Sequence, residues 1–124
     1  MKSRGYTLIE ILVVVALIGI IATIAYPTYQ GYIRSTYQAQ ALADLKSCSM
    51  SLERFYSNAF TYAGADTAGV CTMWSPSDGP STNKKFTITM PTLTKTNYVI
   101  KATPNSSADG ECVQLSADGT QASC

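Results

Sequence analysis

The sequence predicts an α+β protein in which one long N-terminal helix packs on a small antiparallel sheet. Three observations support this fold class. An apolar run fills residues 6–26, a helical stripe of apolar residues continues from about residue 27 to 57, and strand-like runs separated by turn signals fill residues 86–124. Residues 58–85 are rich in Ser, Thr, Ala, Gly and Pro, so we expect a long surface connection between the helix and the strands.

The apolar run is long enough to cross a membrane. As a helix, its 21 residues would extend about 31 Å, close to the ~30 Å thickness of a bilayer core. Lys2 and Arg4 precede the run and Arg34 is the only base shortly after it, so the usual excess of positive charge on the cytoplasmic side places the N-terminus in the cytoplasm. The remainder of the chain would then lie outside.

One charge interrupts the run, and three explanations treat it differently. A simple single-pass anchor gives no reason for Glu10, because a charge at membrane depth costs roughly 2.5–3.5 kcal/mol. A secretory signal peptide is a second explanation, since residues 23–25 resemble a cleavage site, although the apolar run is longer than usual for such a signal. The third explanation rests on a family resemblance, given below.

Beyond the run, the chain is predicted to continue as an amphipathic helix. No proline follows Pro27 before residue 57, and Pro27 should bend the helix because it removes one backbone hydrogen bond. Apolar side chains then recur at alternate steps of four and three, which places them on one face. This stripe consists of Ala41, Leu45, Cys48, Leu52 and Phe55, and the charged residues Arg34, Asp44, Lys46 and Arg54 are expected mostly off it.

Four short runs predict the strands of the sheet, and the last two form a hairpin around a three-residue loop that ends in glycine. In this hairpin Ser116 pairs with Thr120. The same register places Cys112 directly opposite Cys124, where a disulfide can form. The expected strands are residues 86–90, 98–102, 112–116 and 120–124.

The four cysteines favour disulfides over a metal site. The sequence has no CxxC pair and no histidine, so the usual ligand spacing of a zinc site is absent. Cys71, in the long connection, is expected to pair with Cys48 on the helical stripe, and Cys112 with Cys124. Two disulfides place this part of the chain in an oxidising compartment such as a periplasm or the cell exterior.

The composition argues against catalysis and against a general affinity for nucleic acid. Without histidine the chain lacks the commonest general base and metal ligand, so we expect no enzyme activity and no cofactor. Nine Lys and Arg residues against eight Asp and Glu residues give a formal charge of +1, which produces no global field. Any binding of DNA would depend on a local group of bases.

The start of the chain resembles the processing motif of type IV pilins. Residues 4–10 are RGYTLIE, with the apolar run behind them, and the family commonly has phenylalanine where this chain has Tyr6. The five-residue leader and Pro27 also match the family. The resemblance implies that a prepilin peptidase cleaves between Gly5 and Tyr6, that the new Tyr6 amine is methylated, and that Glu10 contacts the Tyr6 amine of a neighbouring subunit.

The resemblance also implies a domain organisation and a function. Residues 1–5 would be the leader peptide, residues 6–26 the transmembrane and filament-core helix, and residues 27–124 the pilin head. The chain would be a structural subunit, most like a PilE-type minor pilin, that crosses the inner membrane with its head in the periplasm and then joins an extracellular pilus. Its partners would be other pilin subunits and the prepilin peptidase, and the filament would serve adhesion, twitching motility or DNA uptake.

Two alternatives remain. A pseudopilin of a type II secretion system usually holds calcium near its C-terminus, and residues 109–111 and 118–119 carry acidic side chains, but their spacing is more typical of turns than of a calcium cage. A pilus-associated DNA receptor would need a basic patch. Its candidates are Lys84, Lys85, Lys95 and Lys101, which are expected to lie near one another on the strands and their connections.

Overall fold

The computed structural model describes residues 5–124, so the expected leader lies outside the described residues except for Gly5. The chain divides into two compact units, one ending at Ile33 and the other comprising Arg34–Cys124. We call the second unit the head.

The long helix α1 comprises Leu8–Ala59, 52 residues without interruption. It begins after Thr7, whose side-chain and main-chain oxygens accept hydrogen bonds from the Glu10 amide at 3.4 Å and 3.1 Å. Such a cap satisfies amides that the first turn leaves without a helical partner. Pro27 lies inside the helix and does not end it. The helix ends where Phe60 takes a positive φ of 55°.

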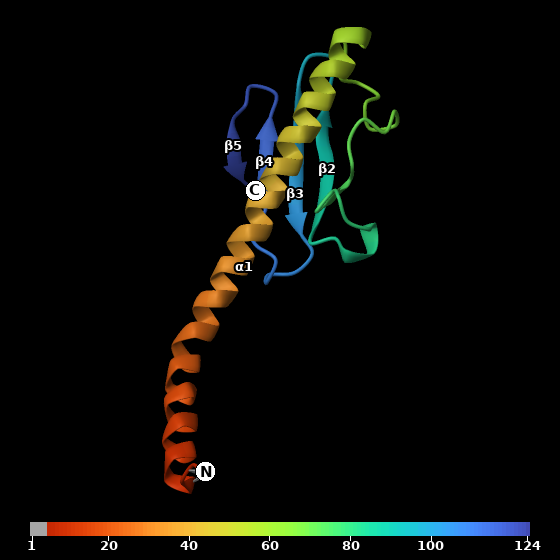
Figure 1. Ribbon diagram of the computed structural model, residues 1–124. Coiled ribbons are helices and arrows are strands. Elements are labelled where there is room, and N and C mark those ends of the chain that lie inside the picture. The colour runs from red at the N-terminus through yellow and green to blue at the C-terminus, as the bar shows by residue number, and fades with distance from the viewer. Residues whose placement is uncertain (1–4) are drawn as a thin grey trace. The chain divides into compact units, whose positions relative to one another are not determined.

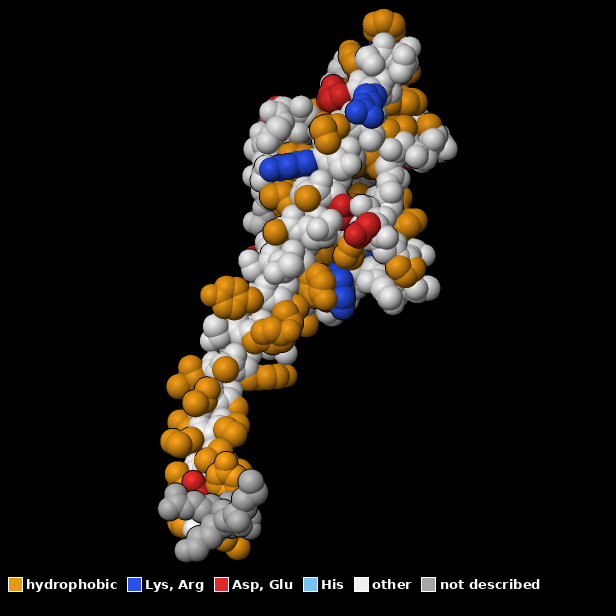
Figure 2. All heavy atoms as spheres, viewed as in Figure 1, with side chains coloured by type: hydrophobic (Ala, Val, Ile, Leu, Met, Phe, Trp, Pro, Cys, Tyr) orange, Lys and Arg blue, Asp and Glu red, His pale blue; other side chains and the backbone are white. Residues whose placement is uncertain are grey.

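The described part of α1 up to Ile33 has no protein core around it. Its large apolar side chains from Leu8 to Ile24 are 46–82% exposed, and Figure 2 shows hydrophobic atoms along this part of the helix. By length and composition, α1 can cross a membrane. Burial of one such side chain is worth about 1.5–3 kcal/mol, so this surface needs lipid or other protein to cover it.

Within the described residues, the head contains one five-stranded antiparallel sheet whose strands lie in sequence order. This arrangement of one helix and one sheet confirms the predicted α+β fold class. The hairpin of the last two strands has the expected register, with Gln114 opposite Ala122. A 3-10 turn at Ser81–Asn83 precedes the second strand. The strands are β1 (Trp74–Ser75), β2 (Phe86–Leu93), β3 (Tyr98–Pro104), β4 (Val113–Ser116) and β5 (Gln121–Ser123).

The C-terminal half of α1 covers one face of this sheet (Figure 1). The predicted stripe lies at this contact: Ala41, Leu45, Cys48 and Leu52 are at most 5% exposed, and Phe55 is partly buried. These side chains meet alternate residues of the central strands, since every second side chain of a strand points to the same face. The sheet contributes Phe86, Ile88, Tyr98, Ile100, Ala102 and Leu115 to the core.

Asp44 departs from the predicted polar face of the helix, because it is only 8% exposed. The connection between α1 and β2 folds back over it and supplies hydrogen-bond donors. Ser77 donates its hydroxyl to Oδ1 at 2.7 Å and its amide to Oδ2 at 3.2 Å, and Ser75 donates its hydroxyl to Oδ2. Gln40 adds a longer bond of 3.4 Å. Asp44, expected off the apolar stripe, is therefore buried beside it, and its burial is tolerated because its oxygens are satisfied.

The connection between α1 and β2, expected to be a surface loop, contains strand β1. Trp74 pairs with Thr87 and Ser75 pairs with Phe86, at one edge of the sheet. The Trp74 indole donates to the carbonyl of Gly79 at 3.0 Å, which closes the turn after β1. Two residues are too few to display the alternation by which a strand is recognised in a sequence.

Two disulfides are present in the described residues, Cys48–Cys71 and Cys112–Cys124, the same pairs that the stripe and the hairpin register predict. The first joins the connection to the buried face of α1. The second closes the β4–β5 hairpin, where the Cys124 amide also donates to the Cys112 carbonyl at 3.3 Å.

Near the end of α1, tyrosines pack around the carboxylate of Glu53. The hydroxyl of Tyr62 donates to Glu53 Oε1 at 2.9 Å, and its ring lies 4.6 Å from the ring of Tyr56 and 4.8 Å from that of Tyr98. Burial, assisted by the Glu53 carboxylate, raises the pKa of Tyr62 to about 12, and burial also raises the pKa of Tyr98. Both hydroxyls therefore keep their protons at neutral pH and act as donors.

Candidate functional site

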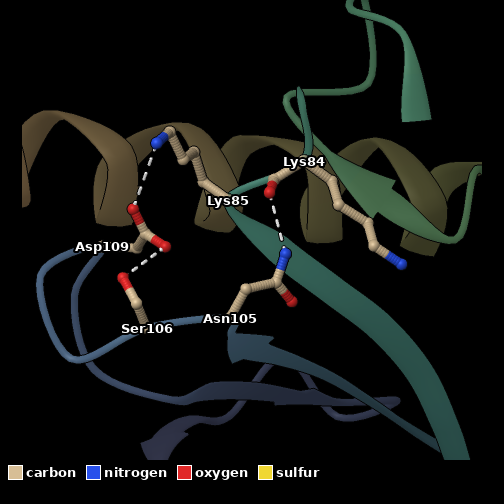
Figure 3. Close-up of polar contacts among 5 residues, drawn as sticks. All are labelled: Lys84, Lys85, Asn105, Ser106 and Asp109. Atoms are coloured by element: carbon tan, nitrogen blue, oxygen red, sulfur yellow. Dashed lines mark hydrogen bonds and ion pairs between the residues drawn. The ribbon is translucent and has the colours of Figure 1, made fainter. Parts of the chain in front are cut away.

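Three basic residues from two parts of the head meet at one loop. We call Arg34 of α1, together with Lys84 and Lys85 just before β2, the basic cluster. The loop is residues 105–110, which follow β3. Each member of the cluster is connected to this loop by a hydrogen bond or an ion pair. The contacts of the two lysines are drawn in Figure 3.

Lys85 is held by charge and by an aromatic ring. Its Nζ lies 3.4 Å from Oδ1 of Asp109 and 5.2 Å from the centre of the Tyr37 ring. The Lys85 side chain is 39% exposed, whereas that of Asp109 is 10% exposed. Ser106 donates its hydroxyl to the other oxygen of Asp109 at 2.8 Å. Lys85 thus remains accessible to solvent while its partner is enclosed.

Lys84 is fixed through its main chain and leaves its side chain exposed. Asn105 donates its side-chain amide to the Lys84 carbonyl at 2.8 Å and its backbone amide to the Lys85 carbonyl at 2.8 Å. Its side-chain oxygen in turn accepts the Thr87 hydroxyl at 2.9 Å. In Figure 3 the Lys84 side chain points away from Asp109. Its ammonium is therefore available to a ligand in solvent.

Arg34 completes the cluster from the helix. One of its terminal nitrogens donates to the Ser107 carbonyl, and its side chain is exposed. The loop can approach α1 this closely because of Gly110, which has a φ of 138°. A Cβ added there would lie 3.1 Å from Cζ of Phe86 and 3.4 Å from Cβ of Gln38. A side chain at this position would push the loop away from the helix.

The cluster is a local excess of positive charge in a neutral head. Two of the nine bases and one of the eight acids precede residue 34, so residues 34–124 carry seven of each. Lys85 and Asp109 form the single ion pair found within residues 5–124. Arg34 and Lys84 have no carboxylate partner there. Arg34 and Lys85 meet the 105–110 loop near one carboxylate, and the exposed Lys84 is next to Lys85 in sequence, so this part of the head can attract an anion although the whole head does not.

The lysines expected to lie together do not all do so. Lys95 follows the last residue of β2, whereas Lys84 and Lys85 precede the first, and eight residues of strand extend about 26 Å. Lys101 lies between them, opposite Thr89. Arg34 was not among the expected DNA contacts, because the residue that it contacts, Ser107, is 73 positions away in the sequence. The β2–β3 register, with Phe86 opposite Pro104, places Lys85 beside Asn105.

The remaining predicted site residues have simpler surroundings. Tyr6 is 80% exposed and, like Gly5, precedes α1, whereas Glu10 lies in its first turn. Of the acidic turns considered for calcium, Asp109 belongs to the basic cluster's ion pair, and Asp118 accepts the Thr120 amide at 2.9 Å, a bond that lowers the pKa of Asp118. No group of three His, Cys, Asp or Glu side chains suited to a metal ion occurs among the described residues.

Two family models match this chain in succession. The model described as the prokaryotic N-terminal methylation motif matches residues 1–26. The model described as the type IV minor pilin ComP, DNA uptake sequence receptor, matches residues 27–116. The second match includes most of the head and the whole basic cluster.

Known proteins similar to this chain include fimbrial proteins. The fimbrial protein of Moraxella nonliquefaciens is 45% identical over 68 residues, which cover 53% of this chain and 44% of that protein. The fimbrial protein of Neisseria meningitidis serogroup B is 34% identical over 71 residues, which cover 56% of this chain and 42% of that protein. The chain spans less than half the length of these relatives.

Among solved structures, the crystal structure of the non-core minor pilin PilV from Neisseria meningitidis has the same fold. The TM-score is 0.60 at 23% sequence identity, and the alignment covers 75% of this chain and 88% of that one.

Proposed function

Because the chain belongs to the type IV pilins, in the family of the minor pilin ComP, the DNA uptake sequence receptor, we propose that its head binds DNA through the basic cluster. The observation that most supports this is the gathering of Arg34, Lys84 and Lys85 by one loop. DNA presents closely spaced phosphates, and bases that neutralise them supply most of the affinity of non-specific binding. Ser107 is exposed beside these bases and suits a contact with the sugar–phosphate backbone.

We expect removal of one basic side chain of the cluster to weaken DNA binding in a salt-dependent way. The logarithm of the binding constant falls linearly with the logarithm of salt concentration, by about 0.9 per phosphate contact. Lys84→Ala should therefore remove about one phosphate contact and reduce the magnitude of this slope by about 0.9. The measurement is fluorescence anisotropy of a labelled duplex with the full chain in a non-ionic detergent, at about 50 to 200 mM salt.

Lys95→Ala is the matched control, because it removes the same charge at the other end of β2. If Lys95→Ala changes the slope as much as Lys84→Ala does, DNA does not bind at the basic cluster. If the unaltered chain binds no duplex even at the lowest salt, the head is not a DNA receptor.

Assembly would proceed from the N-terminal helix. In this proposal residues 6–26 cross the inner membrane with the N-terminus in the cytoplasm, and the head lies in the periplasm until the chain joins an extracellular pilus. There the apolar surface of α1 up to Ile33 is transferred from lipid to the helices of other pilin subunits. The chain acts through assembly and binding, without a catalytic role, in a filament that serves DNA uptake, adhesion or twitching motility.

Processing should precede assembly. A prepilin peptidase would cut between Gly5 and Tyr6, so the mature chain should begin at methylated Tyr6. The formal side-chain charge then changes from +1 to −1, because the loss of Lys2 and Arg4 leaves seven of the nine bases against eight acids. The intact mass of the protein from sheared filaments checks this. A mature chain that begins at Tyr26 would establish a secretory signal instead.

A further inference from the structure

We infer that Asp109 competes with DNA phosphate for Lys85, so that the head keeps one of its three clustered bases occupied until DNA comes close enough to displace the carboxylate. The inference rests on the proposed DNA binding and concerns the regulation of that same site. It follows from a difference between the two side chains: Lys85 is exposed and loosely paired, whereas Asp109 is enclosed and held by Ser106.

The ion pair itself is loose. Its length of 3.4 Å exceeds the roughly 2.7–2.9 Å of a strong charge-assisted hydrogen bond. Lys85 is also 39% exposed, and ion pairs open to water contribute little because water and salt screen them. A phosphate that approaches from solvent can therefore take the place of the carboxylate at the ammonium.

Asp109 does not depend on Lys85 for its position. Its Oδ2 accepts the Ser106 hydroxyl at 2.8 Å, and its amide donates to the Ser106 carbonyl at 3.0 Å. The next residue, Gly110, is packed against Phe86 and α1. The carboxylate therefore stays in the cluster when Lys85 turns to a phosphate, and it repels that phosphate.

Lys85 also keeps a second contact when the carboxylate is displaced. The face of the Tyr37 ring lies 5.2 Å from its ammonium, within the range of a cation–π interaction. This contact holds the ammonium against Tyr37 of α1, the helix that also carries Arg34. Lys85 therefore remains in the cluster for either partner, carboxylate or phosphate.

A purely structural role for Asp109 predicts the opposite sign. If the carboxylate only fastens the loop, its neutralisation should loosen the loop, separate the bases and weaken DNA binding. If it competes with phosphate, its neutralisation should strengthen binding. Asp109→Asn separates the two, because asparagine has nearly the same shape and its side-chain oxygen can still accept the Ser106 hydroxyl.

The test is the same anisotropy titration with the full chain and a random-sequence duplex. Asp109→Asn should bind more tightly than the unaltered chain, and because it removes the negative charge that offsets one base, its salt slope should be steeper by about 0.9. The ratio of its binding constant to that of the unaltered chain should therefore grow about threefold as salt is lowered from roughly 200 to 50 mM. Asp66→Asn is the matched control, since it removes an exposed carboxylate from the connection and should change binding much less.

A second variant keeps the inference testable if Asp109→Asn disturbs the head. Lys85→Ala leaves the Asp109 carboxylate uncompensated in the cluster, so it should weaken binding more than Lys84→Ala does. The inference is overturned if Asp109→Asn keeps the near-UV circular dichroism spectrum of the unaltered chain but binds DNA equally or more weakly. It is also overturned if Lys84→Ala and Lys85→Ala weaken binding equally. Both results leave the proposed function intact as long as Lys84→Ala still lowers the salt slope. Absence of duplex binding by the unaltered chain overturns both.

Discussion

Replacement of Glu10 by valine should leave the chain in the membrane and remove it from filaments. Glu10 lies in the first turn of α1, where its amide is capped by Thr7, and no ion pair of its carboxylate is recorded within residues 5–124. In the proposed filament, the carboxylate pairs with the Tyr6 amine of a neighbouring subunit. Valine would leave that ammonium without a partner in a bundle of low dielectric constant, which opposes assembly by roughly 3–5 kcal/mol.

The anchor explanation predicts the opposite result for the same substitution. If residues 6–26 only anchor the chain, removal of a charge worth roughly 2.5–3.5 kcal/mol of insertion cost should ease insertion and leave function unchanged. The measurement compares the amount of chain in membranes and in sheared filaments of cells that carry Glu10→Val. Glu10→Asp is the control, because it keeps the charge but shortens its reach. Equal amounts of the valine variant and the unaltered chain in filaments would mean that Glu10 has no role in assembly.

Periodic patterns made most of the fold predictable. The stripe from Ala41 to Leu52 fixed which face of α1 is buried, because a helix repeats every 3.6 residues and the apolar residues followed that period. The β4–β5 hairpin could be aligned because its short loop allows few registers, and the cysteine positions agreed with only one of them. Both inferences used residues close in sequence: the first relied on the burial of apolar surface, and the second on a short loop and a cysteine pair.

The parts that could not be predicted depend on contacts between distant residues. Asp44 carries a charge, and the sequence gives no indication that Ser75 and Ser77 fold back to supply its hydrogen bonds. Arg34 was expected off the apolar stripe, and nothing near it in the sequence indicates that it contacts residues 105–110. Polar contacts of this kind have no period, and any serine or asparagine in a connection could make them.

Of the basic cluster, Lys84 and Lys85 were predicted from the sequence as DNA contacts and Arg34 was not. Lys84, Lys85, Lys95 and Lys101 were expected to lie near one another as candidate DNA contacts, but strand β2 separates Lys95 from Lys84 and Lys85. Distance along a sheet is set by strand length, about 3.3 Å per residue, so residues at opposite ends of β2 cannot share a phosphate. The β2–β3 register brings Asn105, and not Lys95, beside Lys85.

Asp44→Ala is expected to be the most damaging single polar substitution in the head. It removes the acceptor of bonds from Ser77, Ser75 and Gln40, and bonds to a charged acceptor contribute about 1.5–3 kcal/mol each before the rest of the structure adjusts. Ser75 is 1% exposed, so water cannot replace the lost acceptor without opening the segment. We expect the free energy of unfolding to fall by about 3–5 kcal/mol.

The emission of Trp74, the only tryptophan of the chain, can measure this loss during unfolding by guanidinium chloride with the full chain in non-ionic detergent. Trp74 is adjacent to Ser75, so its emission should also change in the folded variant as β1 separates from β2, while the Cys48–Cys71 bond still holds the start of the segment. Two controls separate charge from shape. Asp44→Asn keeps an acceptor and should lose less than Asp44→Ala, and Ser77→Ala, which removes one hydroxyl donor, should lose about 1 kcal/mol. Asp44→Ala could instead lower the free energy of unfolding no more than Ser77→Ala does. The disulfide and the packing of α1 on the sheet would then position this segment without the carboxylate, and the burial of Asp44 would contribute little to stability.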